Sequence, residues 1–407
     1  MRILYIHQYF ITPKEPGGTR SYWISRKLIE HGHEVTMLTS SATVPKNASK
    51  GKVNIDGIDV IYLNIPYHGS MPIKQRFIAF IKFALITTKH VLTSGKFDLI
   101  IATSTPLTVG IPALAGSIFK GIPYLFEVRD LWPEVPIQMG GLQNKQAIKL
   151  AQWLEYKIYK RAKHIIALSP GMKDGVLSTG IPEDKVTMIP NMSKPDAFWP
   201  REKDSGLIER LGLQKNSFKV TYFGALGLAN GLDYILDAAE ILKDERDIEF
   251  LFSGGGGAEQ EFKDQCEERK LTNVHFLGNF PMNILSEIVN LADVTLVTFM
   301  NLPILATNSP NKLFDSLSAG KPIIVNSNGW TKSLVEENKC GLYADPLDPS
   351  DLANKIHYLK DRPQLCIEMG INSRRLALEE YDQDILCTKF AKVVDSLDMT
   401  DMTAVTP

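Results

Sequence analysis

Short apolar runs rich in Val, Ile, Leu and Phe alternate with amphipathic segments of helix length over most of the chain. This alternation is typical of βαβ units that build a parallel sheet, so the pattern predicts an α/β protein. In the first half, the predicted strands are 2–6, 34–38, 59–63, 97–101, 124–128, 164–168 and 186–189. The Asp56-Gly57 pair predicts a tight hairpin turn just before the third of them.

The alternation is interrupted over about 190–217, where Pro, Asn and charged residues predominate, and this stretch is the predicted linker. Beyond it the alternation restarts and predicts a second doubly wound domain. Its predicted strands are 219–223, 249–252, 274–277, 294–299 and 323–326, and its predicted helices are 232–243, 258–269, 281–291 and 310–319. From about Asp351 the pattern predicts mostly helix, with a last helix over 384–397 and a frayed tail over 398–407.

A chain of 407 residues exceeds the usual size of one domain, so two hydrophobic cores are expected. We place the N-terminal domain at 1–198, the second domain at 199–380, and a C-terminal helix with its tail at 381–407. Two doubly wound sheets that face each other would place the carboxyl ends of their strands across one cleft, where ligands of such folds bind.

Composition excludes several classes of partner and compartment. The 45 Lys and Arg residues against 46 Asp and Glu give a net charge of -1, which argues against a nucleic-acid partner. The four cysteines form no Cys-x-x-Cys pair, as expected for a reducing cytoplasm without a zinc site or disulfide scaffold. The N-terminus lacks the pattern of a secretory signal, and the longest apolar run, 77–86, falls short of the roughly 20 residues that span a bilayer.

The segment from the strand at 294–299 to the helix at 310–319 predicts an anion site. Ser309 is the expected N-cap, Pro310 the first helical residue and Gly320 the C-terminal stop. The exposed N–H groups at such a helix start attract an anion.

Three side chains of this helix extend the prediction to a phosphate beside a sugar. Lys312 adds a positive charge in the first turn and Asn311 an amide, while Asp315 lies one turn deeper on the face of Asn311. A carboxylate there can accept hydrogen bonds from a ribose diol. The alternative is that the Ser-Pro pair only caps a helix and that Asp315 pairs with a neighbouring side chain.

Three glycine-rich turns follow predicted strands and would let the backbone approach a diphosphate. The candidate contacts in these turns are Gly17, Gly18, Arg20, Gly224, Asn230, Gly231 and Gly255. None of the turns fits the dinucleotide fingerprint or the P-loop pattern, which disfavours a dehydrogenase or an ATP-driven enzyme. The alternative for each turn is ordinary βα geometry.

Several motifs resemble those of glycosyltransferase family 4, retaining enzymes of the GT-B fold, over nearly the whole chain. They are Ile6-His7-Gln8-Tyr9-Phe10, Gly17-Gly18, Gly32-His33-Glu34-Val35, Ser169-Pro170-Gly171-Met172, Ile189-Pro190-Asn191 and Ala319-Gly320-Lys321-Pro322-Ile323. Two more segments resemble the branch of O-antigen and capsule N-acetyl-fucosamine transferases. They are Glu127-Val128-Arg129-Asp130-Leu131-Trp132-Pro133-Glu134 and Gly227-Leu228-Ala229-Asn230-Gly231-Leu232-Asp233.

The resemblance implies two facing Rossmann-like domains with a deep cleft between them. It implies that the second domain binds a UDP-sugar, that the first receives an undecaprenyl-type lipid-linked saccharide, and that the last helix crosses back to the first domain. Retention by front-face attack needs no enzymatic base, because the leaving phosphate takes the acceptor proton. The UDP-sugar is then a substrate, and no cofactor or metal ion is expected.

The chain departs from the family pattern at four positions. Arg129 stands where the family commonly has a histidine before the conserved aspartate. Thr307 stands where the family often has the first of two glutamates, and Ala225 and Asn230 stand where it often has Arg and Lys. These departures leave Lys312, with Arg20 or Arg129, to balance the charge of a diphosphate.

Donors aimed at the leaving phosphate contribute most to such catalysis, so Lys312 is the first catalytic candidate. Arg129, Asp130 and Glu134 are further candidates, because the carboxylates could hold acceptor hydroxyls or orient Arg129. The alternative for the two carboxylates, which flank a Trp, is a structural cluster of salt bridges.

The segment 73–92 predicts one helix with a basic stripe and apolar neighbours, suited to the inner face of the plasma membrane. The lysines Lys74, Lys82 and Lys89 fall within roughly 80° of arc. The apolar residues around them are Phe77, Phe80, Ile81 and Phe83. The alternative is an ordinary surface helix with extended lysines.

Three rival functions stay open: a nucleotide-sugar epimerase or hydrolase of the same fold, a non-catalytic subunit that binds the acceptor, and a dehydrogenase, which shares only the sheet type and lacks the dinucleotide fingerprint. The favoured hypothesis is a peripheral, cytoplasmic glycosyltransferase of cell-surface polysaccharide synthesis, acting in O-antigen, capsule or lipopolysaccharide assembly. The sequence predicts no particular oligomeric state.

Overall fold

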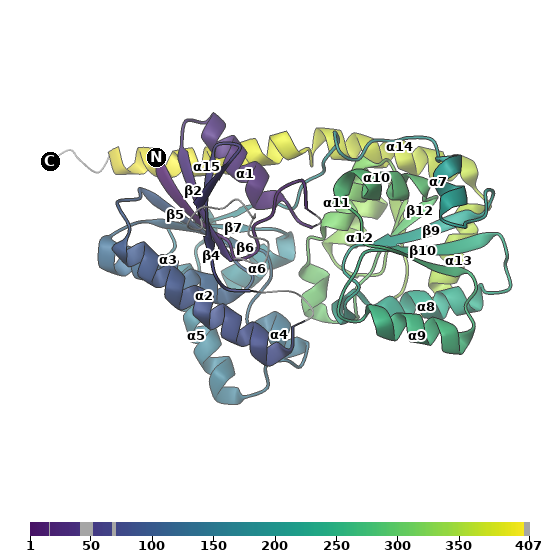
Figure 1. The fold of residues 1–407 in the computed structure, drawn as a ribbon, viewed down its shortest axis with the longest axis horizontal. Coiled ribbons are helices and arrows are strands. Elements are labelled where there is room, and N and C mark those ends of the chain that lie inside the picture. Colours follow the sequence, from purple (N-terminus) through teal and green to yellow (C-terminus); the bar gives the residue numbers. More distant parts are fainter. Residues whose placement is uncertain (16, 41–51, 67–70, 403–407) are drawn as a thin grey trace. The chain divides into compact units, whose positions relative to one another are not determined.

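The computed structural model describes residues 1–15, 17–40, 52–66 and 71–402 (Figure 1). The chain divides into two compact units. Unit 1 comprises Met1–Thr12, Thr19–Pro190 and Asp384–Pro407, and unit 2 comprises Pro13–Gly18 and Asn191–Gln383. Each unit is an α/β domain around one mainly parallel sheet, which confirms the predicted fold class.

The sheet of unit 1 has the order β3-β4-β2-β1-β5-β6-β7-β8 over the described residues. Its strands are β1 (Arg2–Ile6), β2 (Glu34–Ser40), β3 (Lys52–Ile55), β4 (Ile58–Leu63), β5 (Leu99–Thr103), β6 (Tyr124–Val128), β7 (His164–Ala167) and β8 (Val186–Met188). Only the β3–β4 pair is antiparallel among these pairings. Asp56 and Gly57 join this pair with φ of 49° and 91°, the positive values of a tight hairpin turn, so the predicted hairpin is confirmed.

Helices cover both faces of this sheet, with α1 and α15 on one side and α2 and α3 on the other (Figure 1). The helices of unit 1 are α1 (Arg20–Glu30), α2 (Ile73–Thr93), α3 (Gly110–Lys120), α4 (Glu134–Gln138), α5 (Lys145–Arg161), α6 (Pro170–Ser178) and α15 (Gln383–Met402). Helix α15 extends to Met402, so the frayed tail predicted from Asp398 is wrong as far as that residue, and 403–407 lie outside the described residues. Of the helices in the described residues, none is both long and apolar enough to cross a membrane.

The sheet of unit 2 is parallel throughout its described pairings, with the order β11-β10-β9-β12-β13-β14. Its strands are β9 (Phe218–Phe223), β10 (Ile248–Ser253), β11 (Val274–Gly278), β12 (Val294–Val297), β13 (Ile323–Val325) and β14 (Gly341–Tyr343). Its helices are α7 (Ser205–Arg210), α8 (Leu232–Ile241), α9 (Glu259–Arg269), α10 (Met282–Leu291), α11 (Asn311–Ser318), α12 (Trp330–Glu337), α13 (Pro349–Lys360) and α14 (Pro363–Glu379). The predicted strand at 294–299 ends early, at Val297, and β14 was not predicted.

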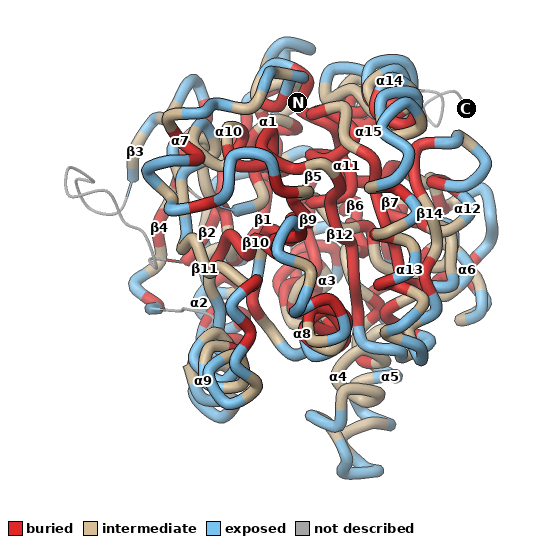
Figure 2. The backbone as a smooth tube through the Cα atoms, turned by 90° about the vertical axis from the view of Figure 1, so that its right-hand side faces the viewer, coloured by how far each residue is buried: buried red, intermediate tan, exposed pale blue. Residues whose placement is uncertain are grey.

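The central strands of both sheets are buried, as the red strands of Figure 2 show. Every residue of β10 is buried, including Glu249, because helices cover both faces of the sheet. A buried carboxylate needs polar partners. Glu249 therefore accepts hydrogen bonds from the amide of Gln214 at 3.1 Å and from the Ser217 hydroxyl, with the ammonium of Lys219 at 3.6 Å.

The turns after β9 and β10 pack backbone against backbone. The amide of Gly224 donates to Ser253 O at 2.8 Å, and the amide of Leu226 donates to Gly255 O at 3.0 Å. Gly254 has a φ of +146°, and a Cβ added to it would lie 1.8 Å from Gly224 O. Part of the glycine run after β10 is therefore required by packing alone, as the alternative reading of ordinary βα geometry supposed.

We expect Gly254→Ala to destabilise unit 2 by more than about 2 kcal/mol, because the new Cβ meets backbone at a strained φ. Gly257→Ala is the matched control, since nothing lies within 4 Å of a Cβ at Gly257. Its effect should stay within about 0.5 kcal/mol. Urea unfolding of both variants measures the difference, and equal stabilities would contradict the packing described.

Candidate functional site

The sheet of unit 2 has a topological switch point at β9, which pairs with β10 on one side and β12 on the other. Ligands of doubly wound folds bind at the carboxyl ends of strands at such points. A pocket of about 380 Å³ lies there, formed by the turns after β9 and β10 and by the start of α11. The predicted site residues that line it are Gly17, Gly18, Gly224, Asn230, Gly255, Asn311, Lys312 and Asp315.

The start of α11 faces this pocket with Asn311 and Lys312. The predicted cap is wrong by one residue, because Pro310 takes the N-cap position and the helix begins at Asn311. Ser309 instead accepts a hydrogen bond from the amide of Asn191 at 3.1 Å, so its hydroxyl is engaged elsewhere. No side chain caps the helix, and the amides of Asn311 and Lys312 have no acceptor among the described residues. These two amides are available to an anion.

The ammonium of Lys312 lies in the pocket with neutral partners. It donates to the hydroxyl of Tyr222 at 2.5 Å and to Oδ1 of Asn230 at 3.1 Å, and no carboxylate of the described residues forms an ion pair with it. The side chain is buried, and this burial lowers the pKa of Lys312 to about 7. A buried cation without a counter-ion is unfavourable, and a bound anion would relieve that cost.

Asp315 does pair with a neighbouring side chain, as the alternative reading supposed. The partner is Lys194, whose Nζ lies 2.8 Å from Asp315 Oδ1, and both side chains are buried in the wall of the pocket. Burial raises the pKa of Asp315, and the ammonium of Lys194 opposes that shift. One Asp315 oxygen is thus engaged by Lys194, while the pair as a whole adds no net charge to the pocket.

Sequence reasoning missed Lys194, because it lies in the stretch predicted to be a linker. In the structure this stretch begins as a buried strip along α11. The amide of Lys194 donates to Ser318 Oγ at 2.9 Å, and Ser193 Oγ donates to Phe314 O at 3.1 Å. The stretch does not follow the βαβ periodicity, and its local pattern does not reveal that it contacts a helix more than 100 residues away.

Two predicted contacts do not line this pocket. Gly231 adopts φ +61°, and a Cβ there would lie 2.7 Å from Phe299 O, so its glycine is required by packing. Arg20 is buried in unit 1, where its Nε donates to Glu127 Oε1 at 2.8 Å and its Nη2 to Ile189 O at 3.0 Å. Arg20 therefore has a structural role, tying α1 to β6 and to the end of β8.

Unit 1 carries a polar cluster at the carboxyl ends of β1, β5 and β6. The guanidinium of Arg129 lies 3.3 Å from His7 Nε2, and Ser21 Oγ lies 2.7 Å from His7 Nδ1. Burial, with Arg129 beside it, holds the pKa of His7 well below its usual value, so the neutral ring accepts from Arg129. His7 lies in the family motif Ile6-His7-Gln8-Tyr9-Phe10, but it was not predicted as a site residue.

The two predicted carboxylates of unit 1 have separate partners. Asp130 accepts from Thr105 Oγ1 at 2.7 Å, and burial raises the pKa of this carboxyl. Glu134 lies in the first turn of α4 and accepts from Gln138 Nε2 at 2.8 Å. Neither forms an ion pair with Arg129 among the described residues, so the suspected cluster of salt bridges is absent there.

Comparison with known proteins assigns both halves of the chain to sugar-transfer enzymes. Residues 17–192 match the model of a glycosyl transferase 4-like domain, and residues 206–376 match the model of glycosyl transferases group 1. Together the two matches cover most of both units.

Individual relatives agree with these matches. A probable glycosyltransferase, WbjE of Pseudomonas aeruginosa, is 23% identical and covers 81% of each chain. The N,N'-diacetylbacillosaminyl-diphospho-undecaprenol alpha-1,3-N-acetylgalactosaminyltransferase of Campylobacter jejuni is 23% identical over 67% of this chain and 71% of its own. Alr3699/HepE of Anabaena, solved in complex with UDP-glucose, has a similar fold, with a TM-score of 0.71 at 18% identity over 97% of this chain and 100% of its own.

The low pKa of Lys312 predicts that anion binding depends on pH. Above pH 7 the unbound ammonium loses its proton and the anion-bound one keeps it, so binding takes up a proton and weakens as pH rises. We expect the affinity for pyrophosphate to fall by up to about tenfold per pH unit between pH 7 and 9.

The matched control is Lys312→Arg, whose guanidinium stays charged over this range. Calorimetry measures the affinity of the wild type and of Lys312→Arg for pyrophosphate at each pH. Because pyrophosphate titrates identically in both experiments, its own titration cancels in the ratio of the two affinities. A ratio that stays constant from pH 6 to 9 would contradict the role of this lysine.

Proposed function

Because the chain is a glycosyltransferase with two GT-B-type domains, we propose that it moves a sugar from a UDP-sugar to a lipid-linked saccharide, with retention of configuration. The reaction would serve the synthesis of a bacterial cell-surface polysaccharide, such as O-antigen or capsule. An N-acetylated hexosamine or 6-deoxyhexosamine, such as N-acetyl-fucosamine, is the proposed donor sugar, on the resemblance of 127–134 and 227–233.

The observation that carries the proposal is the buried Lys312 ammonium beside the uncapped start of α11. Both face a pocket at the switch point of unit 2, and the lysine lacks a carboxylate partner among the described residues. Its Nζ also lies against Asn230, the position where the family often has a lysine, so Lys312 supplies a cation there from another element. A diphosphate matches both the charge and the amide donors.

The rest of the pocket fits a nucleoside. Asp315 keeps an oxygen for a ribose hydroxyl while Lys194 holds the other, and Lys194 fixes the rotamer of the carboxylate. Phe198, Phe280 and Leu285 add an apolar wall on which a flat base can lie.

In the proposed reaction, the bond between the anomeric carbon and the β-phosphate oxygen breaks, and the acceptor oxygen forms the new bond on the same face. The acceptor proton passes to the leaving phosphate oxygen. Negative charge grows on the diphosphate in the transition state, and there Lys312 and the α11 amides stabilise it most. In this scheme these groups take the place of a divalent cation.

In this proposal unit 1 receives the acceptor. The Arg129, Asp130 and His7 cluster at the carboxyl ends of its strands presents polar groups suited to saccharide hydroxyls. The Campylobacter relative is named for a diphospho-undecaprenol substrate, which supports a lipid-linked acceptor.

Lys312→Ala should lower kcat for sugar transfer by at least about 100-fold, the scale expected when a donor to transition-state charge is removed. Lys355→Ala is the control, because Lys355 lies on α13 and pairs with Asp351 outside the pocket. Transfer from a panel of UDP-sugars to an undecaprenyl-diphosphate saccharide is measured with and without EDTA. Near-normal turnover of Lys312→Ala, or loss of turnover in EDTA, would refute this scheme.

The same assay separates the rival functions. A hydrolase or epimerase would consume the UDP-sugar at full rate without acceptor, whereas a transferase should release little UDP until acceptor is added. A non-catalytic subunit would bind the acceptor and show no turnover in either case.

We also propose that unit 1 attaches to a membrane surface through α2. The helix contains no Asp or Glu, and one face exposes apolar side chains beside Lys74, Lys82 and Lys89. The exposed apolar residues are Phe77, Ile78, Ile81, Leu85, Ile86 and Leu92. Phe80 and Phe83, which were expected to join this face, are buried against unit 1, so that part of the expectation is wrong.

The exposed apolar face continues onto the end of α3. Lys120 at that end donates to Val91 O at 3.1 Å and to Ser94 O at 2.7 Å, which holds it beside the end of α2. The adjoining Phe119 is 72% exposed. Exposed apolar residues with lysines among them match the boundary between lipid headgroups and acyl chains, here at the inner face of the plasma membrane.

The double variant Ile81→Glu/Leu85→Glu should bind anionic vesicles at least about tenfold more weakly, because each apolar side chain contributes on the order of 1.5–3 kcal/mol when buried. Ile241→Glu is the matched control, since Ile241 is 54% exposed but lies on α8 in unit 2. Flotation with vesicles of phosphatidylcholine and phosphatidylglycerol at low salt is the measurement. Equal flotation of the two variants would remove the proposal.

A further inference from the structure

A second cavity of unit 2 lies at the other end of its strands from the Lys312 pocket. It has a volume of about 820 Å³, and it is lined by Phe218 at the start of β9, Asp293 just before β12 and Pro322 just before β13. Helix α14 forms one wall. Because the strands are parallel, this cavity, the basal groove, lies at their amino ends, whereas the Lys312 pocket lies at their carboxyl ends.

The lining of the basal groove carries an excess of positive charge. The basic residues are Arg201, Lys203, Lys321, Lys360, Arg374 and Arg375, and the acidic ones are Glu202, Asp293 and Glu379. Lys203 is neutralised by Asp293 at 2.6 Å, and Lys360 by Asp247 at 2.7 Å. Neither Lys321 nor the two arginines of α14 form an ion pair with a described carboxylate. Nη1 of Arg374 donates to three backbone oxygens, those of Pro195, Phe198 and Ser318, which are neutral partners. This uncompensated charge favours an anion.

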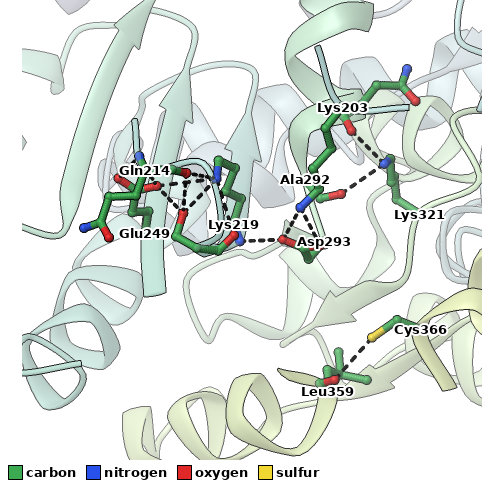
Figure 3. Close-up of polar contacts among 11 residues, drawn as sticks. Lys203, Gln214, Lys219, Glu249, Ala292, Asp293, Lys321, Leu359 and Cys366 are labelled. Carbon is green, nitrogen blue, oxygen red and sulfur yellow. Dashed lines mark hydrogen bonds and ion pairs between the residues drawn. The ribbon is translucent and has the colours of Figure 1, made fainter. Parts of the chain in front are cut away.

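Lys321 is the most buried of these uncompensated cations. Its ammonium donates to two backbone carbonyls, that of Asn290 at 2.9 Å and that of Ala292 at 3.0 Å. Figure 3 shows Lys321 beside Ala292. These bonds cap the end of α10 and leave a third N–H donor. Burial lowers the pKa of Lys321 to about 8, so its charge is poorly solvated. Nearby, Nε of Arg201 is buried without an acceptor among the described residues.

The α14 wall is apolar and exposed. Ile367 is 56% exposed, Ile371 64% and Leu378 44%. Their spacing of four and seven residues places them on one stripe of the helix, next to Arg374 and Arg375. A ligand that covered this stripe would remove a large apolar surface from water.

We propose that the basal groove is a second binding site, for a single amphipathic anion with an acidic head group and an alkyl chain. The head group would lie by Lys321 and the α14 arginines, and the chain would cover Ile367, Ile371 and Leu378. A small polar anion would leave the isoleucine stripe in water, and a neutral apolar ligand would leave the cations uncompensated. An amphipathic anion satisfies both parts of the groove.

The probe is monomeric dodecyl phosphate, below its critical micelle concentration, titrated into the full chain by calorimetry. We expect saturable binding of one molecule, and at least tenfold weaker binding of both inorganic phosphate and neutral dodecyl maltoside. Lys321→Met and Ile371→Glu should each weaken dodecyl phosphate binding at least tenfold. Lys243→Met should bind like the wild type, because Lys243 is an exposed lysine just after α8 and lies outside the groove.

Lys321→Met also removes the bonds that cap α10 and could unfold the unit, so Ile371→Glu on the exposed stripe is the decisive variant. Unchanged pyrophosphate binding by Ile371→Glu would show that the Lys312 pocket is intact. The proposal is overturned by an absence of saturable binding, by equal binding of dodecyl maltoside, by unchanged binding to Ile371→Glu, or by binding only to vesicles that contain dodecyl phosphate. None of these outcomes bears on sugar transfer, which is tested at Lys312.

Discussion

The candidate site depends on a positive charge that the protein buries without neutralising. Lys312 and the uncapped start of α11 lie together at the switch point of unit 2, where the ammonium donates to a hydroxyl and an amide oxygen and lies over the ring of Tyr222, all of them uncharged. Two other buried lysines of unit 2 differ, because Lys194 and Lys219 each have a buried carboxylate as an ion-pair partner. A buried cation without a counter-ion lowers the stability of the free protein, and a bound anion offsets that loss of stability.

The neighbouring features of unit 2 support that arrangement. The backbone contact between the turns after β9 and β10 brings Gly224 and Gly255 to the pocket without side chains in the way. The segment that starts at Asn191 lies along α11, and it places Lys194 where it can hold Asp315. One pocket thus contains the free amides at the start of α11, the ammonium of Lys312, and the Asp315 carboxylate that Lys194 orients. Together these groups match a diphosphate joined to a ribose.

Periodicity predicted the α/β class, nearly all strands and the helix at 310–319, because buried parallel strands and amphipathic helices have strong local patterns. It failed where a residue's partner is distant. Ser309 has the type and position of an N-cap, yet its hydroxyl bonds to Asn191. Lys194 was overlooked for the same reason, since its partner Asp315 lies 121 residues further along the chain. In α2 the helix was predicted, but the burial of Phe80 and Phe83 depends on packing that no local pattern reveals.

The most direct test of the central claim is a crystal structure of the chain with UDP. The account predicts diphosphate oxygens within hydrogen-bond distance, about 3 Å, of the amides of Asn311 and Lys312 and of the Lys312 ammonium. It also predicts a ribose hydroxyl on Asp315. A diphosphate bound elsewhere, with the start of α11 left without an anion, would contradict it.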